Sequence, residues 1–82
     1  MNGKYDGNQS LTQSYRKHVG NKLREKRLEK NYSLQAVAND TGHSKSTISN
    51  IENGSAKFSL EIMGELAAYY GIPLDTLLAS AM

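Results

Sequence analysis

The sequence predicts an all-α domain of five short helices. Apolar residues recur three and four positions apart in successive segments, which is the period of a helix with one buried face. Serines such as Ser33 and Ser44 stand where helices would begin, and a serine side chain can cap a helix N-terminus. Glycines such as Gly42 and Gly54 stand where helices would end, because glycine readily adopts the left-handed closing conformation. With 82 residues, the chain has room for one domain with a modest core.

Residues 1–13 are predicted to be a flexible N-terminal tail, and residues 14–82 the folded domain. The first dozen residues contain two glycines, two asparagines and few apolar side chains, a composition that cannot bury enough surface to order the chain. The first helix is then expected from about Ser14 to Lys30.

The first predicted helix has an apolar inner face that ends in a charge. Residues at intervals of four on this face are Tyr15, Val19, Leu23 and Arg27. A buried arginine needs a charged partner, because desolvating one charge alone is costly. The outer face has charged residues spaced so that they could form i,i+3 and i,i+4 ion pairs: Lys22, Glu25, Lys26, Glu29 and Lys30. These charges are therefore either a solvated helix face or part of a basic surface.

The segment 33–54 reads as two short helices joined by a tight turn. In the first helix, one narrow face holds Leu34, Val37, Ala38 and Thr41. Gly42 breaks that helix, and Ser44 caps the next one, whose only apolar edge is Ile48 with Ile51. The second helix is otherwise polar, so it is expected to pack along a thin seam and to expose most of its surface.

Two helices of about two turns, joined at an angle by a glycine turn, predict a helix-turn-helix whose second helix enters the DNA major groove. A pair of helices in an ordinary bundle is the alternative, which periodicity alone does not exclude. Lys45 suits guanine and Asn50 suits adenine. The predicted base-contacting residues are Ser44, Lys45, Ser46, Ser49 and Asn50. The predicted phosphate-contacting residues are Ser33, Gln35, Asn53, Ser55 and Lys57.

Two further helices are expected after Gly54. The fourth is capped by Ser59 and carries Leu60, Met63, Leu66, Ala67 and Tyr70 at helical spacing. Gly64 lies inside it, and we expect another helix to approach closely there. Gly71 ends this helix and Pro73 opens a last one, from Leu74 to about Ser80. The apolar excess at this end is predicted to form a dimer interface, or alternatively to close the core: Ile72, Leu74, Leu77 and Leu78.

Composition and charge exclude several functions. The segment 16–57 has nine basic and four acidic residues, a balance of +5, whereas the whole chain is only +2. The chain lacks cysteine and any apolar run of the roughly 18 residues that a membrane span requires, so a cytoplasmic protein is expected. His18 and His43 are too few for a metal site and are expected at the surface or at a cap. Three tyrosines are expected in the core: Tyr15, Tyr32 and Tyr70. We expect neither an enzyme nor a cofactor.

The chain resembles the Cro and phage-repressor (XRE-like) helix-turn-helix regulators over about residues 16–79. The resemblance is carried by the segment L-A-A-Y-Y-G-I-P-L-D and by Arg27, Ser33, Val37, Ala38, Gly42, Ser44, Ile48, Ile51, Glu52 and Gly54. It implies a five-helix lambda-repressor-like fold and a buried ion pair between Arg27 and Glu52. It also places Ser44, Lys45, Ser46 and Asn50 at base-contacting positions. Leu34 and Phe58 depart from the family, where many relatives have glutamine and proline.

The predicted function is a sequence-specific regulator of transcription that binds double-stranded DNA. We expect a repressor that acts as a homodimer on a palindromic operator. The alternative is an antitoxin-type interaction module that binds a toxin partner encoded nearby, with DNA binding secondary. Phage repressor, restriction-modification controller and antitoxin remain open as biological roles.

Overall fold

A computed structural model describes residues 13–55 and 60–79, and this part of the chain forms five α-helices and no strand. The helices are α1 (Gln13–Glu29), α2 (Leu34–Thr41), α3 (Lys45–Asn53), α4 (Leu60–Tyr70) and α5 (Leu74–Ala79). The predicted all-α, five-helix fold is confirmed. Most of the predicted tail and the proposed cap Ser59 lie outside the described residues. The sequence places Gln13 in the tail, but it is the first residue of α1.

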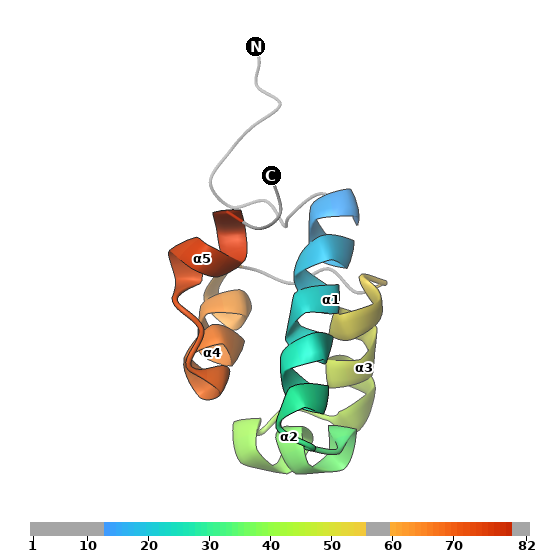
Figure 1. Ribbon diagram of the computed structural model, residues 1–82. Coiled ribbons are helices and arrows are strands. Elements are labelled where there is room, and N and C mark those ends of the chain that lie inside the picture. The colour runs from blue at the N-terminus through green and yellow to red at the C-terminus, as the bar shows by residue number, and fades with distance from the viewer. Residues whose placement is uncertain (1–12, 56–59, 80–82) are drawn as a thin grey trace.

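Helix α1 is the central element of the fold. Figure 1 shows α3 running antiparallel to α1 on one side, with α4 and α5 on the other side. Helix α2 lies across the end of this arrangement, where it packs against α3. None of the helices in the described ranges is long and apolar enough to cross a membrane.

The ends of α2 and α3 are set by their capping residues. Ser33 and Ser44 have extended backbone, and their hydroxyl oxygens accept hydrogen bonds from the amides of Ala36 and Thr47, both at 3.0 Å. Gly42 and Gly54 end the helices with φ angles of 81° and 72°. Because serine and glycine satisfy some of the free backbone groups at both ends, two helices of only 8 and 9 residues keep defined boundaries.

The core is a single apolar cluster to which every helix contributes. Its members are Val19, Leu23, Val37, Ala38, Ile48, Ile51, Met63, Leu66, Ala67, Tyr70 and Leu77. Helix α3 contributes only Ile48 and Ile51 to it, as its thin apolar edge predicts. Two charged residues, Arg27 and Glu52, are also buried.

Gly20 and Gly64 both lie inside helices, but only Gly20 is in close contact with another helix. A Cβ atom at Gly20 would lie 2.2 Å from the carbonyl oxygen of Ile51 and 2.8 Å from that of Glu52. Gly20 therefore lets the backbone of α1 approach the end of α3. At Gly64 nothing lies within 4 Å of the same position, so the expectation of a close helix approach there is wrong.

The C-terminal helix corrects part of the predicted dimer interface. Leu77 is only 2% exposed and belongs to the core, so it has no surface left for a second subunit. Leu74 is 39% exposed and Ile72 is half-buried, so both remain available. The side chain of Leu78 lies outside the described part of the chain.

The predicted core tyrosines also differ from one another. Tyr70 is buried, and Tyr15 packs partly buried against the cluster. Tyr32 is 38% exposed, so its assignment to the core is wrong. It instead meets the ring of Tyr69 at a centroid distance of 6.0 Å.

The two helical glycines give opposite mutational expectations. Gly20→Ala should destabilise the domain by about 1–3 kcal/mol, because its methyl group forces α1 and α3 apart. Gly64→Ala should stabilise it by roughly 0.5–1 kcal/mol, since alanine loses less backbone entropy and meets no neighbour. Urea unfolding followed by circular dichroism measures both. Equal effects of the two substitutions would contradict the close α1–α3 contact.

Candidate nucleic-acid interface

The outward face of α3 is a row of polar side chains. Ser46, Asn50 and Asn53 follow one another at helical spacing and are all exposed. Lys45, in the first turn, is also exposed, and Ser49 is half-buried beside them. The opposite face carries the buried pair Ile48 and Ile51. The helix therefore presents small polar groups outward over almost its whole length.

The residues proposed to contact bases differ in their freedom to bind a ligand. The hydroxyl of Ser44 accepts from the amide of Thr47 and donates to Oγ1 of Thr47 at 2.9 Å, so it is committed to the cap. Lys45, Ser46 and Asn50 form no side-chain hydrogen bond within residues 13–55 and 60–79. An amide such as that of Asn50 can form two hydrogen bonds with the major-groove edge of adenine.

The residues proposed to contact phosphates lie at two places beside α3. Ser33 and Gln35 stand at the start of α2, where Gln35 Nε2 donates to Oδ1 of Asn39 at 3.0 Å. Asn53 and Ser55 are exposed at the end of α3. The hydroxyl of Ser55 donates to the carbonyl of Asn50 at 3.3 Å.

Lys57 lies outside the described residues, so the structure does not place this expected phosphate contact.

A buried ion pair joins α1 to α3. Arg27 Nε donates to Glu52 Oε2 at 2.8 Å, and Arg27 Nη2 donates to Glu52 Oε1 at 3.0 Å. The remaining nitrogen, Nη1, donates to the carbonyl of Tyr32 at 2.9 Å. The hydrogen bond to Glu52 raises the pKa of Arg27, so the guanidinium stays charged. The two-point contact fixes the rotation of α3 about its own axis.

Tyr70 of α4 lies near this pair, and its neighbour Tyr69 contacts Asp40. Burial, together with the nearby Glu52 carboxylate, raises the pKa of Tyr70 to about 12. Burial and a hydrogen bond to Asp40 also raise the pKa of Tyr69 above its ordinary value. Both phenols are therefore neutral near pH 7, and their rings meet edge to face at 4.9 Å.

Two polar contacts tie the helix-turn-helix to α4. Tyr69 Oη donates to Asp40 Oδ2 at 2.6 Å, and His43 Nε2 lies 2.6 Å from Glu65 Oε1. The sequence predicts His43 only at the surface or at a cap. It predicts neither contact, because both partners lie more than twenty residues away. Gly20 was missed too, although a glycine inside a long helix was the available signal.

Within residues 13–55, the acidic side chains all have partners, whereas several basic side chains form no ion pair. Every acidic side chain within residues 13–55 has a partner, and the partners of Glu25, Glu29, Asp40 and Glu52 are Lys22, Lys26, Tyr69 and Arg27. Four cations of the same segment form no ion pair with any described residue, namely Lys17, Arg24, Lys30 and Lys45. Three of the four partners are cations, whereas the neutral Tyr69 leaves the charge of Asp40 in place. Within residues 13–55, unpaired cations therefore outnumber unpaired carboxylates. No cluster of three His, Asp or Glu side chains that could hold a metal occurs in the described ranges.

Residues 23–77 match the family model HTH_3, which is described as helix-turn-helix. This match agrees with the geometry of α2 and α3. The chain belongs to the HTH_3 helix-turn-helix family. The suspected resemblance is confirmed, and the family is one of transcriptional regulators that bind double-stranded DNA rather than a class of enzymes.

Individual relatives agree with this assignment. The chain is 33% identical over 60 residues to the cryptic phage CTXphi transcriptional repressor RstR of Vibrio cholerae. The match covers 73% of this chain, which spans about half of that repressor, 54% of its length.

Solved structures of other HTH_3-like regulators show the same fold. The clp gene regulator ClgR of C. glutamicum superposes with a TM-score of 0.75 at 25% identity, covering 89% of this chain and 90% of ClgR. The restriction-modification controller protein C.AhdI of Aeromonas hydrophila superposes with a TM-score of 0.71 at 28% identity. That match covers 79% of this chain and 94% of C.AhdI.

The buried ion pair gives a stability prediction. Glu52→Gln should destabilise the domain by about 3–5 kcal/mol, because it leaves the charge of Arg27 buried and unpaired. Replacing both partners, as in Arg27→Met with Glu52→Leu, should destabilise it less than Glu52→Gln alone, since no buried charge remains. Denaturant unfolding of the three proteins measures the difference.

The exposed pair Lys26–Glu29 provides the matched control. Its Nζ–Oε1 distance is 3.0 Å, but the Glu29 side chain is 67% exposed. Glu29→Gln should therefore change stability by less than about 1 kcal/mol. If Glu52→Gln unfolded at the same denaturant concentration as Glu29→Gln, the pair would not hold α1 and α3 together.

Proposed function

We propose that this protein is a sequence-specific repressor of transcription that acts as a homodimer on a palindromic operator. The family supports DNA binding and regulation. Repression is supported by the similarity to RstR, a transcriptional repressor. The place of action is then the compartment that holds the DNA, which is the cytoplasm in bacteria.

The observation that carries the proposal is the polar face of α3. Lys45, Ser46 and Asn50 are exposed, have no partner among the described side chains, and lie on a helix whose other face is locked into the core. A helix fixed from behind can dock into the major groove without losing packing energy. Short serines allow the helix to approach the bases closely, while Lys45 and Asn50 supply directional hydrogen bonds.

The base-reading role is tested by selecting bound sequences from a pool of random duplexes. The wild type should enrich a palindromic site, and Asn50→Ala should bind that site about 1–3 kcal/mol more weakly, with relaxed preference at one base pair of each half-site. A promoter that carries the enriched site should lose reporter expression when the wild type is supplied.

Ser55→Ala is the matched control for Asn50→Ala, because a residue proposed to touch only phosphate should weaken binding to all sequences alike. Equal losses on selected and random DNA for Asn50→Ala would contradict its base-reading role. Failure of the wild type to enrich any sequence would contradict the proposed function.

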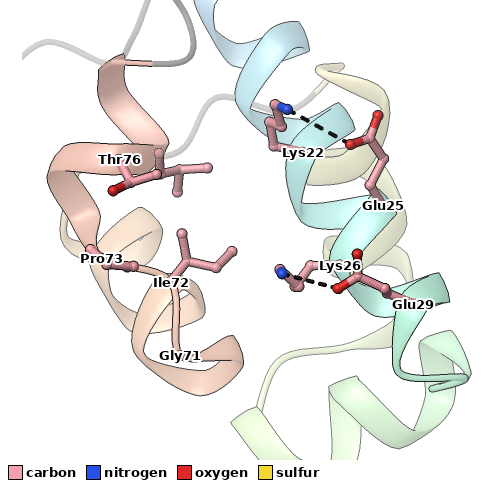
Figure 2. A pocket seen from close by; sticks show the side chains of 9 residues that line it. Lys22, Glu25, Lys26, Glu29, Gly71, Ile72, Pro73 and Thr76 are labelled. Carbon is pink, nitrogen blue, oxygen red and sulfur yellow. Dashed lines mark hydrogen bonds and ion pairs between the residues drawn. The ribbon is translucent and has the colours of Figure 1, made fainter.

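The dimer is proposed to form through the groove between α1 and α5. This groove has a volume of about 350 Å³ and is lined on one side by Ile72 and Pro73 (Figure 2). On the other side, α1 presents alternating lysines and glutamates. Such a surface is self-complementary, because a two-fold axis can bring lysines of one copy to glutamates of the other. One recognition helix reads few base pairs, so two copies spaced by about 34 Å are required for a specific operator.

Leu74→Glu tests this interface, since Leu74 is exposed in the monomer and adjoins Pro73. The charge should weaken the dimer at least about tenfold, because burying an unpaired carboxylate at an interface costs more than about 1.4 kcal/mol. Sedimentation equilibrium measures the dissociation constant. The control is Leu28→Glu, at a leucine of α1 that is 51% exposed. A wild type that stays monomeric on its operator, or a greater loss in the control, would contradict the proposed interface.

A further inference from the structure

Helix α1 has two polar faces that differ in charge. The face toward α5 carries Lys22 and Lys26, and each is paired with a glutamate one turn further along (Figure 2). The distances from Nζ to Oε1 are 3.9 Å for Lys22–Glu25 and 3.0 Å for Lys26–Glu29. This face is therefore locally neutral.

The face of α1 beside α3 carries cations without such partners. A groove of about 480 Å³ opens there, lined by Lys17, His18, Asn21, Arg24, Glu52 and Asn53. Lys17, His18 and Arg24 are exposed, and within the described ranges none of them forms an ion pair. The one acidic residue of the groove, Glu52, is already bound at two points by Arg27. An anion that enters this groove meets positive charge that no protein carboxylate has satisfied.

The groove adjoins the end of the proposed DNA-reading helix. Asn53 is the last residue of α3, and Gly54 packs so closely on α1 that a Cβ atom there would lie 2.7 Å from Cα of Lys17. Ser55, already proposed to contact phosphate, follows directly. Lys17 therefore stands beside the backbone segment through which the chain leaves α3.

We propose that this groove, centred on Lys17 and Arg24, binds one or two neighbouring phosphates of the DNA backbone at the C-terminal end of α3. The inference rests on the proposed function and assigns to α1 a contact beyond the base-reading and phosphate residues named above. Arg24 offers a planar fork of donors for phosphate oxygens, Lys17 a compact charge, and the amides of Asn21 and Asn53 neutral donors. On the other face of α1, Lys22 and Lys26 already pair with glutamates and are therefore not free to bind a phosphate.

A purely structural role for Lys17 makes a different prediction. The C-terminal end of a helix carries partial negative charge, and a nearby lysine stabilises it by a fraction of a kcal/mol. Such a role would appear in the unfolding midpoint and would leave the salt dependence of DNA binding unchanged. Phosphate binding would appear in the salt dependence instead.

The experiment compares single variants that each lose one positive charge. Lys17→Gln and Arg24→Gln each remove a cation of the groove, and Lys30→Gln removes an exposed cation that lines neither this groove nor the one between α1 and α5. The probe is a random-sequence duplex of about 30 base pairs, because phosphate contacts do not depend on sequence. Binding is measured by fluorescence anisotropy across a series of salt concentrations, with circular dichroism to confirm folding.

Each groove variant should lower the slope of log affinity against log salt by about 1 relative to wild type, because each phosphate contact contributes about 0.9. The control variant should keep the wild-type slope within about half of one contact. Equal slopes for the groove variants and the control, or groove variants altered only in their unfolding midpoints, would overturn the inference while leaving the proposed function standing. A wild type with no salt-dependent binding to duplex DNA would overturn the proposed function itself.

Discussion

The outward face of α3 depends on how α1 holds the helix from behind. With only Ile48 and Ile51 in the core, α3 has too narrow an apolar edge to fix its own rotation. Two contacts with α1 supply the rest. Gly20 allows the helix backbones to meet, and Arg27 then grips Glu52 through two hydrogen bonds. A shift of α3 would force the two backbones together at Gly20 and leave the charge of Arg27 buried and unpaired. Both changes cost much free energy, so these two contacts, more than apolar packing, fix the position of the polar face.

The Arg27–Glu52 pair fixes the relative orientation of the helices more than it adds to the free energy of unfolding. Desolvating both charges offsets much of their attraction, and apolar residues of similar volume would often stabilise a core as well or better. The guanidinium, however, is satisfied only in one geometry, since its third donor also reaches the carbonyl of Tyr32 where α1 ends. Tyr70 stays neutral beside the pair, so no third charge competes for Arg27. The pair thus links the end of α1, the end of α3 and the turn at Tyr32 in one arrangement.

Helix boundaries could be predicted from the sequence because they depend on local chemistry. The caps Ser33 and Ser44 and the stop at Gly42 act within four residues of themselves. Gly20 and Gly64 could not be distinguished in this way, because both are glycines inside helices and only the packing of distant segments shows which one is crowded. Leu77 presents the same difficulty: in a helix of six residues, periodicity does not separate a core side from an interface side. The contacts of Tyr69 and His43 with distant acids were likewise beyond local inference.

The distribution of charge follows from where the acids of the helix-turn-helix half lie. Glu25 and Glu29, the two acids of α1, lie on the face that turns toward α5 and neutralise the lysines there. Asp40 is held by Tyr69, and Glu52 is held by Arg27. A net charge of +2 over the whole chain therefore says little about the field that a DNA molecule would meet. Because Glu25 and Glu29 pair with lysines on the face toward α5 and Glu52 pairs with Arg27 in the core, no carboxylate of the described residues neutralises Lys17 and Arg24 on α1 or Lys45 on α3.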